Sequence, residues 1–198
     1  MKTTAILCSL VLAAAARAAP EEFAYCTVCH GAEGNGNVVI GAPKIAGLDG
    51  AYLSRQLQAF RAGWRGTDAA DLHGREMYFI AAAIPDDAAL ARAIAFVAGF
   101  ESKAPASIVD GNARRGAKHY AACSACHGER GEGNAELRAP ALVDQSDWYL
   151  AAQLEGYRAG WRGTAAGDEL GAQMRAMAVA LPDDAAIADV VAYINSLR

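Results

Sequence analysis

The sequence repeats itself at a constant offset of 97 residues. The string RAGWRGT at 61–67 recurs at 158–164, and PDDAA at 85–89 recurs at 182–186. No insertion or deletion interrupts the match, so the two copies are expected to share one fold. Each copy has about 90 residues, a usual size for a small domain. The polar, proline-containing segment ESKAPAS at 101–107 is the expected linker between the copies.

Both copies are expected to be helical. Asp49 and Ser146 occupy equivalent positions, and both residue types favour helix N-termini. Gly63 and Gly160 favour the ends of the same two helices. The copies therefore predict one helix from about residue 49 to 62 and its equivalent in the second copy.

The last helix of each copy is expected to open at a proline, Pro85 or Pro182, with two aspartates in its first turn. Apolar residues follow at helical spacing and predict one buried stripe per helix. The stripes are Leu90, Ile94, Val97 and Phe100 in the first copy, and Ile187, Val190, Val191, Ile194 and Leu197 in the second. No segment shows sustained strand alternation, so the predicted fold is all-α, with two tandem domains.

Residues 1–18 have the features of a secretory signal peptide. Lys2 precedes an apolar run over 5–16, and ARA at 16–18 is a small-residue cleavage signal. A retained membrane anchor is the alternative, but the run is short for a bilayer span. A lipid anchor on Cys8 fits less well, because Cys8 lies inside the run instead of at its end.

Removal of the signal peptide defines the mature, periplasmic chain. Within this mature chain, the repeat predicts an N-terminal domain over 19–100, the linker over 101–107 and a C-terminal domain over 108–198. Without Lys2 and Arg17, the 18 basic residues become 16 against 22 acidic ones, a formal charge of −6. Such a chain is a poor match for nucleic acid.

Cys-x-x-Cys-His occurs once in each copy, as YCTVCHG at 25–31 and ACSACHG at 122–128. A dithiol redox pair would need no histidine. A four-cysteine zinc site would leave both histidines unused and would join motifs from separate domains. The motif is typical of c-type haem attachment, which takes place outside the cytoplasm. The sequence therefore predicts two covalently attached haem c groups, held by Cys26, Cys29, Cys123 and Cys126.

An iron bound by one histidine needs a second ligand if it is to carry electrons without binding a substrate. The mature chain has three methionines, and only Met77 lies in the first copy. Met174 is its repeat equivalent, whereas Met177 is equivalent to Ile80. Met77 and Met174 are the predicted second ligands, and Met177 is predicted to fill the core.

Two further histidines are alternative candidates for the second ligand. His73 lies four residues before Met77, but its repeat equivalent is Leu170, so it cannot serve both copies. His119 lies on the helix expected before the second haem motif and is predicted to be a surface residue. Methionine remains the predicted ligand in both copies.

The chain resembles the class I cytochromes c, in the duplicated two-haem form of the cytochrome c4 type. The matching elements are Cys-x-x-Cys-His-Gly, then Ala-Pro at 42–43 and 139–140, and a terminal AYINSL. Between them, Met-x-x-x-Ala-x-x-[Ile/Leu] stands at 77–84 and 174–181. The resemblance covers nearly all of the mature chain.

The resemblance implies a role for each motif residue. The proximal iron ligands would be His30 and His127, and the distal ligands Met77 and Met174. The carbonyls of Pro43 and Pro140 would accept from the ring N–H of the histidines. Residues shared by the two copies could line the haem edge or bind propionates: Tyr52, Gln56, Trp64, Arg65 and their equivalents.

One departure from the family concerns the first helix. In the family this helix crosses the last helix through a glycine and an aromatic residue. In the second copy these are Gly116 and Tyr120, facing Tyr193, on a helix predicted over 110–123. In the first copy the equivalents are Ala19 and Phe23, so most of the helix is missing. The N-terminal domain is therefore predicted to be the less stable one.

The leading functional prediction is a periplasmic electron carrier and not an enzyme. Its partners would be redox proteins such as a quinol-oxidising complex, a terminal oxidase or a dehydrogenase. The carrier could also dock to a membrane complex. The alternative is a dihaem subunit of a larger dehydrogenase or terminal oxidase complex. A haem enzyme, for instance a peroxidase or a thiosulfate-oxidising enzyme, would require an open iron site.

Overall fold

The computed structural model describes residues 21–198, so the predicted signal peptide and Ala19 lie outside the described residues. This part contains eight α-helices and two short 3-10 helices. Their bounds are η1 (Glu21–Phe23), α1 (Ala24–His30), η2 (Val38–Ile40), α2 (Gly50–Arg61), α3 (Leu72–Ala82), α4 (Asp87–Ala98), α5 (Ala113–His127), α6 (Asp147–Ala159), α7 (Glu169–Val179) and α8 (Asp184–Asn195). Extended pairing within it is limited to two isolated bridges, so the predicted all-α fold is confirmed.

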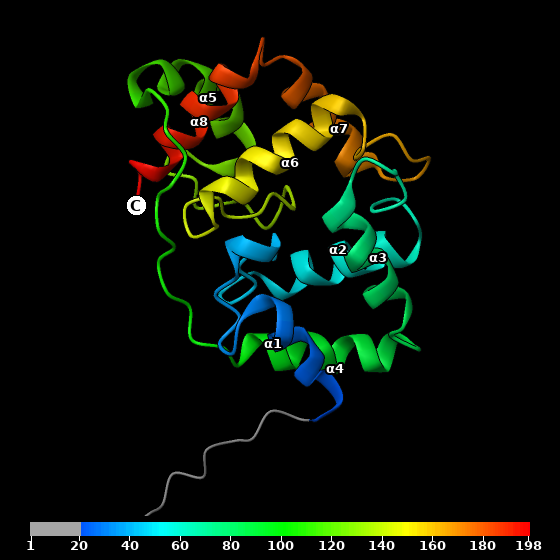
Figure 1. The fold of residues 1–198 in the computed structure, drawn as a ribbon. Helices are drawn as coiled ribbons and strands as arrows, with labels where there is room; N and C mark the ends of the chain where they lie inside the picture. Colours follow the sequence, from blue (N-terminus) through cyan, green and yellow to red (C-terminus); the bar gives the residue numbers. More distant parts are fainter. Residues whose placement is uncertain (1–20) are drawn as a thin grey trace, which may run out of the picture.

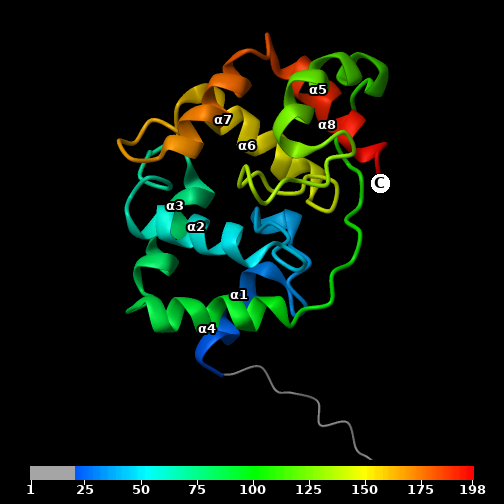
Figure 2. The same cartoon turned by 180° about the vertical axis from the view of Figure 1, so that it is seen from behind.

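Helices α1–α4 and α5–α8 gather in two halves of the molecule, which we call the N-terminal and C-terminal halves (Figure 1). An extended segment connects α4 to α5 along one side, as the view from behind also shows (Figure 2). Over residues 21–198, no helix combines the length and the apolar character that crossing a membrane requires.

Helix α2 begins at the predicted cap. The Asp49 carboxylate accepts a hydrogen bond from the Tyr52 backbone N–H at 2.8 Å, which satisfies one of the free donors of the first turn. Ser146, at the start of α6, makes no such side-chain bond. Its own backbone N–H donates to Oε1 of Gln145 at 2.7 Å. Equivalent positions thus start equivalent helices by different contacts.

The last helix of each half begins later than predicted. Asp86 and Asp183 are the N-caps of α4 and α8, and each accepts from the backbone N–H three residues on, at 2.7 Å and 2.8 Å. The predicted starts at Pro85 and Pro182 are therefore wrong, because the first aspartate of each pair has extended backbone and acts as the cap. Only the second aspartate lies in the first turn.

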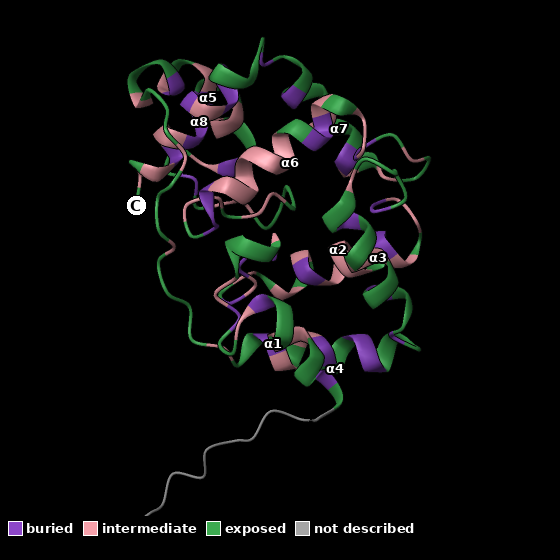
Figure 3. Ribbon diagram, in the orientation of Figure 1, coloured by how far each residue is buried: buried purple, intermediate pink, exposed green. Residues whose placement is uncertain are grey.

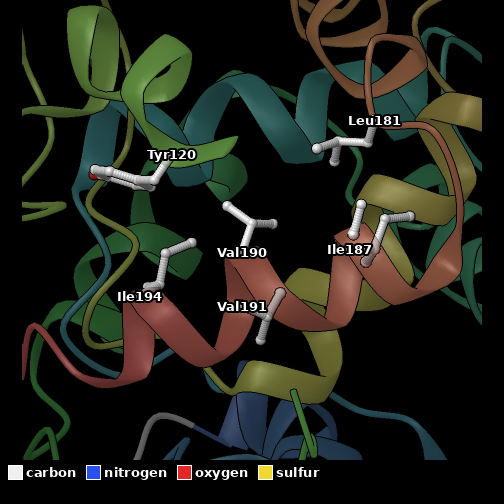
Figure 4. Close-up of a cluster of buried hydrophobic side chains, with 7 residues drawn as sticks. Tyr120, Leu181, Ile187, Val190, Val191 and Ile194 are labelled. Atoms are coloured by element: carbon white, nitrogen blue, oxygen red, sulfur yellow. The ribbon is translucent and has the colours of Figure 1, made fainter. Parts of the chain in front are cut away.

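The apolar stripe on α8 forms the centre of the C-terminal core (Figure 4). Its four innermost members are at most 3% exposed: Ile187, Val190, Val191 and Ile194. The corresponding cluster of the N-terminal half is smaller and contains Ile84, Ala89 and Leu90, with Leu57 and Ile94 packed against it. Colouring by burial shows the same contrast between α8 and the more exposed α1 and α3 (Figure 3).

The halves differ most at their first helix. Helix α5 has 15 residues, whereas α1 has seven. Gly116 and Tyr120 are buried against α8, and the rings of Tyr120 and Tyr193 lie 5.2 Å apart. In the N-terminal half, where Ala19 lies outside the described residues, the equivalent aromatic contact joins Phe23 and Phe96 at 6.1 Å. The expected shortening of the first helix is confirmed.

Candidate haem-binding sites

Each motif histidine is buried at the C-terminal end of its helix. His30 and His127 are 6% and 5% exposed. Their Nδ1 atoms lie 2.7 Å and 2.8 Å from the carbonyl oxygens of Pro43 and Pro140. Because a carbonyl only accepts, Nδ1 carries the proton and donates it, and Nε2 keeps its lone pair. Each imidazole is thus held in the tautomer that can bind a metal through Nε2.

The surroundings also favour the neutral form of these rings. Burial lowers the pKa of His30 and of His127, and the hydrogen bond to the proline carbonyl opposes this only in part. A neutral imidazole is the form that donates an electron pair to a metal. Both sites therefore present a ring ready to act as a ligand.

A glycine-rich loop positions each proline. The backbone N–H of Gly36 donates to the His30 carbonyl at 2.8 Å, and the equivalent bond in the C-terminal half has the same length. Gly36 has a φ of 88°, and a Cβ at this position would lie 2.8 Å from the backbone nitrogen of Lys44. Only glycine permits this approach, which brings Pro43 under the histidine.

The four motif cysteines lie on the same helices as the histidines, and none of them is paired in a disulfide. Cys26 and Cys29 share one side of α1, and Cys123 and Cys126 share one side of α5, because their spacing is close to one turn. Burial raises the pKa of Cys26 and Cys123.

Among residues 21–198, no three His, Cys, Asp or Glu side chains come together as a metal site, and this contradicts a four-cysteine zinc centre.

Met77 lies on α3 and Met174 on α7, at equivalent positions, and both are half-buried. The two helices begin in the same way, because Asp71 and Asp168 each accept from the glycine N–H three residues on at 2.9 Å. The repeat of the sequence is therefore also a repeat of local structure around the two methionines.

Two of the other candidate side chains, Met177 and His73, are more exposed than Met77 and Met174. Met177 is 39% exposed, so its predicted role in the core is wrong. The adjacent Ala178, which is fully buried, takes the inward position of α7 instead. His73 has a side chain 60% exposed and lies 3.3 Å from Glu76. His119 is half-buried on α5.

The donor set of each half fits a c-type haem. Two thiols one turn apart are followed directly by a neutral imidazole whose free nitrogen is Nε2. When bound, the haem supplies an iron that can accept and return one electron. The proline carbonyl holds the histidine imidazole in place, and burial of the imidazole excludes water from it.

Known proteins resemble this chain along most of its length. The model of the cytochrome c family matches residues 113–198. A thiosulfate dehydrogenase electron acceptor of Stutzerimonas stutzeri (strain A1501) is 37% identical over 164 residues, covering 77% of this chain and 71% of the relative. Cytochrome c4 of Azotobacter vinelandii is 32% identical over 188 residues, covering 88% and 85%. The chain belongs to the two-haem cytochromes c of the cytochrome c4 type.

The fold of this cytochrome agrees with that family. The crystal structure of reduced recombinant cytochrome c4 from Pseudomonas stutzeri matches with a TM-score of 0.70 at 28% identity, covering 89% of this chain and 95% of that one. The chain is therefore an electron-transfer protein with two class I cytochrome c domains and two covalently bound haem c groups.

Arginine and glutamine residues shared by the two copies meet across the boundary between the halves of the cytochrome. Arg65 donates to Oε1 of Gln56 at 2.6 Å and to Oε1 of Gln153 at 3.1 Å. Arg162 donates to the same two oxygens, at 3.0 Å for Gln56. We call these four residues the boundary quartet. The sequence showed that they are identical between the copies, but not that they contact one another.

The cations of the boundary quartet are buried. Arg65 and Arg162 are each 5% exposed, and their guanidinium groups lie 4.2 Å and 4.3 Å from the ring centroids of Phe60 and Tyr157. No carboxylate is among their hydrogen-bond partners in the described part of the chain. Burial raises the pKa of the neighbouring Tyr52 hydroxyl to about 12. The boundary thus concentrates positive charge in a water-poor region.

Lys44 is a boundary residue that sequence reasoning missed. It is 1% exposed, and its Nζ donates to the Asp144 carbonyl at 2.8 Å. Gln145 donates from Nε2 to the Lys44 carbonyl at 2.9 Å. Burial lowers the pKa of the lysine. Its repeat equivalent is Ala141, so a comparison of the copies passes over it.

Proposed function

We propose that this cytochrome is an exported carrier that takes single electrons from a dehydrogenase and passes them to a further redox protein. His30 and Met77 would bind the first iron, and His127 and Met174 the second. The observation that carries the assignment is the pair of buried histidines, each held by a proline carbonyl in the same position of its copy.

A thiosulfate dehydrogenase is the proposed electron donor. Relatives named as electron acceptors of that enzyme are 37% identical in Stutzerimonas stutzeri (strain A1501) and 38% identical over 162 residues in Thiomonas intermedia (strain K12). A terminal oxidase or another redox protein would then accept the electrons from this cytochrome. The N-terminal sequence supports a periplasmic location after cleavage of residues 1–18.

We propose domain limits of 19–100 and 108–198, with residues 101–107 as the linker. The start of this linker is bound to the N-terminal half, where the Lys103 N–H donates to Oδ1 of Asn35 at 2.9 Å. Its end is bound to the C-terminal half, where Arg198 donates to the Pro105 carbonyl at 3.0 Å. The N–H groups of Ile108 and Val109 already donate to a carboxylate of the C-terminal half.

A stable complex is the alternative to a free carrier. The thiosulfate dehydrogenase (TsdBA) structure from Marichromatium purpuratum matches 85% of this chain and 35% of that longer one, with a TM-score of 0.66 and 28% identity. This likeness favours a dehydrogenase complex as the second candidate. Purification from the native cell distinguishes the two, because a subunit elutes with its enzyme and a free carrier elutes alone.

Spectra and haem counting test the proposed iron ligands. We expect two haems per chain, a far-red band from methionine ligation, and no change when carbon monoxide is added to the reduced protein. Binding of carbon monoxide at one iron would contradict the ligand assignment and favour an enzyme. Rapid reduction by a thiosulfate dehydrogenase supplied with thiosulfate is expected, and its absence would exclude the proposed donor.

A further inference from the structure

The boundary quartet holds two positive charges whose hydrogen-bond partners are all neutral. The guanidinium groups of Arg65 and Arg162 donate to the amide oxygens of the two glutamines, and that of Arg65 also donates to the Tyr149 hydroxyl at 3.4 Å. An arginine keeps its charge in a protein, and a buried charge without a counter-charge is costly. The quartet therefore favours binding of a negatively charged group.

Each of these guanidinium groups also has a donor to spare. Nε of Arg65 and Nε of Arg162 are buried, and neither has a hydrogen-bond partner among the described residues. Buried donors nearly always meet an acceptor, and a carboxylate is a strong acceptor for guanidinium N–H groups. The two equivalent arginines thus offer one carboxylate site from each half.

The arginine of the N-terminal half lies beside the helix that carries a proposed iron ligand. Gly66 follows Arg65 directly, and a Cβ on this glycine would overlap the carbonyl oxygen of Gly74 and lie 2.9 Å from Cβ of Tyr78. Both of these residues are on α3, and Tyr78 is the neighbour of Met77. The backbone next to Arg65 is therefore in contact with α3 at the level of the methionine.

The C-terminal half repeats this contact. Gly163 follows Arg162, and a Cβ on this glycine would overlap the carbonyl oxygen of Gly171 and lie 2.9 Å from Cβ of Arg175. Both lie on α7, and Arg175 is the neighbour of Met174. The quartet is thus joined to the methionine-bearing helices of both halves.

Hydrogen bonds of the quartet cross the boundary in both directions. Arg65 donates to Gln153 on α6 at 3.1 Å, and Arg162 donates to Gln56 on α2 at 3.0 Å. These two helices lie on opposite sides of the boundary in Figure 1. Because both arginines donate to the same two oxygens, their charges are close together and are held by both halves. Burial weakens the screening of these charges by water, so each acts on both halves.

We propose that the boundary quartet couples the two haems, because its two cations form one shared charge that binds carboxylates of both haems and raises both reduction potentials. The carboxylates are those of the propionate side chains that each haem carries. This inference rests on the presence of two haems and does not depend on the proposed electron donor. Reduction adds one electron to an iron and lowers the charge of that haem by one, and no bond forms or breaks. A nearby fixed cation favours the reduced form and so raises the potential.

The test measures the reduction potential of each haem in the full holoprotein, with small redox mediators and no partner protein. Paramagnetic NMR separates the haems, because their methyl signals are assigned to a half through contacts with residues of that half. Arg65→Gln and Arg162→Gln each remove one cation of the quartet. The matched controls are Arg61→Gln and Arg158→Gln, four residues earlier in the same repeated string, where each arginine is paired with an aspartate.

We expect each quartet variant to lower the reduction equilibrium constant of the haem in its own half by about tenfold, which is 59 mV for a one-electron couple. The haem of the other half should lose at least about threefold, because the charge is shared. The controls should stay within about twofold at both haems, because exposed ion pairs are screened. A shift confined to the haem of the same half would overturn the coupling, and so would unchanged potentials.

Two further variants separate charge from structure, and they keep the test decisive if a glutamine variant fails to fold. Arg65→Lys, measured at pH 6, retains the charge and should keep both equilibrium constants within about threefold of wild type. Gln56→Glu retains the shape but places a carboxylate between the two arginines, so it should lower both potentials without loss of stability. A purely structural role predicts unchanged potentials in Gln56→Glu, and that result would overturn the proposal.

A free anion is the other source of the negative group. Replacement of chloride by phosphate at constant ionic strength should leave the wild-type potentials unchanged if the haem carboxylates occupy the quartet. If it shifts both wild-type potentials but not those of Arg65→Gln, the quartet holds a free anion and the proposal is overturned. Haem content, the far-red band and the unfolding midpoint show whether each variant is intact.

Discussion

The backbone of Gly116 lies directly against the peptide carbonyl of Asp189, with no space for a methyl group between α5 and α8. A Cβ on Gly116 would overlap the Asp189 oxygen and would lie 2.9 Å from Cβ of Tyr193. We therefore expect Gly116→Ala to lower the free energy of unfolding of the C-terminal half by about 1–3 kcal/mol or more, because backbone atoms cannot yield. Denaturant unfolding followed at the second haem measures this.

Gly156 provides the control for that substitution. It lies on α6, and the nearest atom to an added Cβ would be a Trp161 ring carbon at 3.7 Å. Gly156→Ala should leave stability unchanged or raise it by up to about 1 kcal/mol, through helix propensity. Similar losses for both alanine variants would show that the close crossing is not the cause.

The N-terminal half is expected to unfold at a lower denaturant concentration than the C-terminal half. Helix α1 is about two turns shorter than α5, and the extra turns of α5 pack on α8. Each side chain buried in such a contact contributes on the order of 2 kcal/mol to the free energy of unfolding. The two haems report on the two halves, so unfolding can be followed at each separately. Equal midpoints would contradict the prediction.

Removal of the proposed methionine ligands should affect one haem at a time. Met77→Ala is expected to open the first iron to carbon monoxide and Met174→Ala the second, each with loss of one of the two far-red contributions. Met177→Ala, at a position 39% exposed, is the control and should leave both irons closed. The reduced spectrum with and without carbon monoxide is the measurement. A response from the control alone would reverse the assignment.

Asp147 should make the stability of the C-terminal half depend on pH. Burial by itself would raise the pKa of this carboxyl, but hydrogen bonds from the N–H groups of Val109 and Ile108 and from Asn195 outweigh it and lower the pKa. The native state therefore favours the ionised form. Its contribution is complete above the unfolded pKa of about 3.9 and is lost as the pH falls through the lower native value.

Asp147→Asn tests this linkage. At pH 7 we expect a loss of about 1–3 kcal/mol, because the amide cannot accept all the hydrogen bonds that the carboxylate does. The difference from wild type should shrink as the pH falls below about 3.9. Asp144→Asn changes an exposed carboxylate nearby and should have little effect at either pH. A deficit that stays constant with pH would contradict the role of charge.

Much of the candidate site was accessible from the sequence, because its signals are local. The Cys-x-x-Cys-His spacing places thiols and imidazole on about one helical turn, and the 97-residue offset selects Met77 and Met174 from the three methionines that follow residue 18. The misplaced helix starts at Pro85 and Pro182 had a local cause as well. Whether proline or the following aspartate caps a helix depends on backbone angles that residue type alone does not specify.

The sequence by itself determined the duplicated all-α design, the haem chemistry and the shortened first helix of the N-terminal half. The tertiary structure alone decided which residues meet across the boundary. Arg65 and Gln153 stand 88 positions apart, and Lys44 and Asp144 stand 100 apart. Such contacts follow from how the two halves dock and from the burial that results. Helical periodicity and residue spacing record only neighbours within a few turns, so they contain no information about that docking.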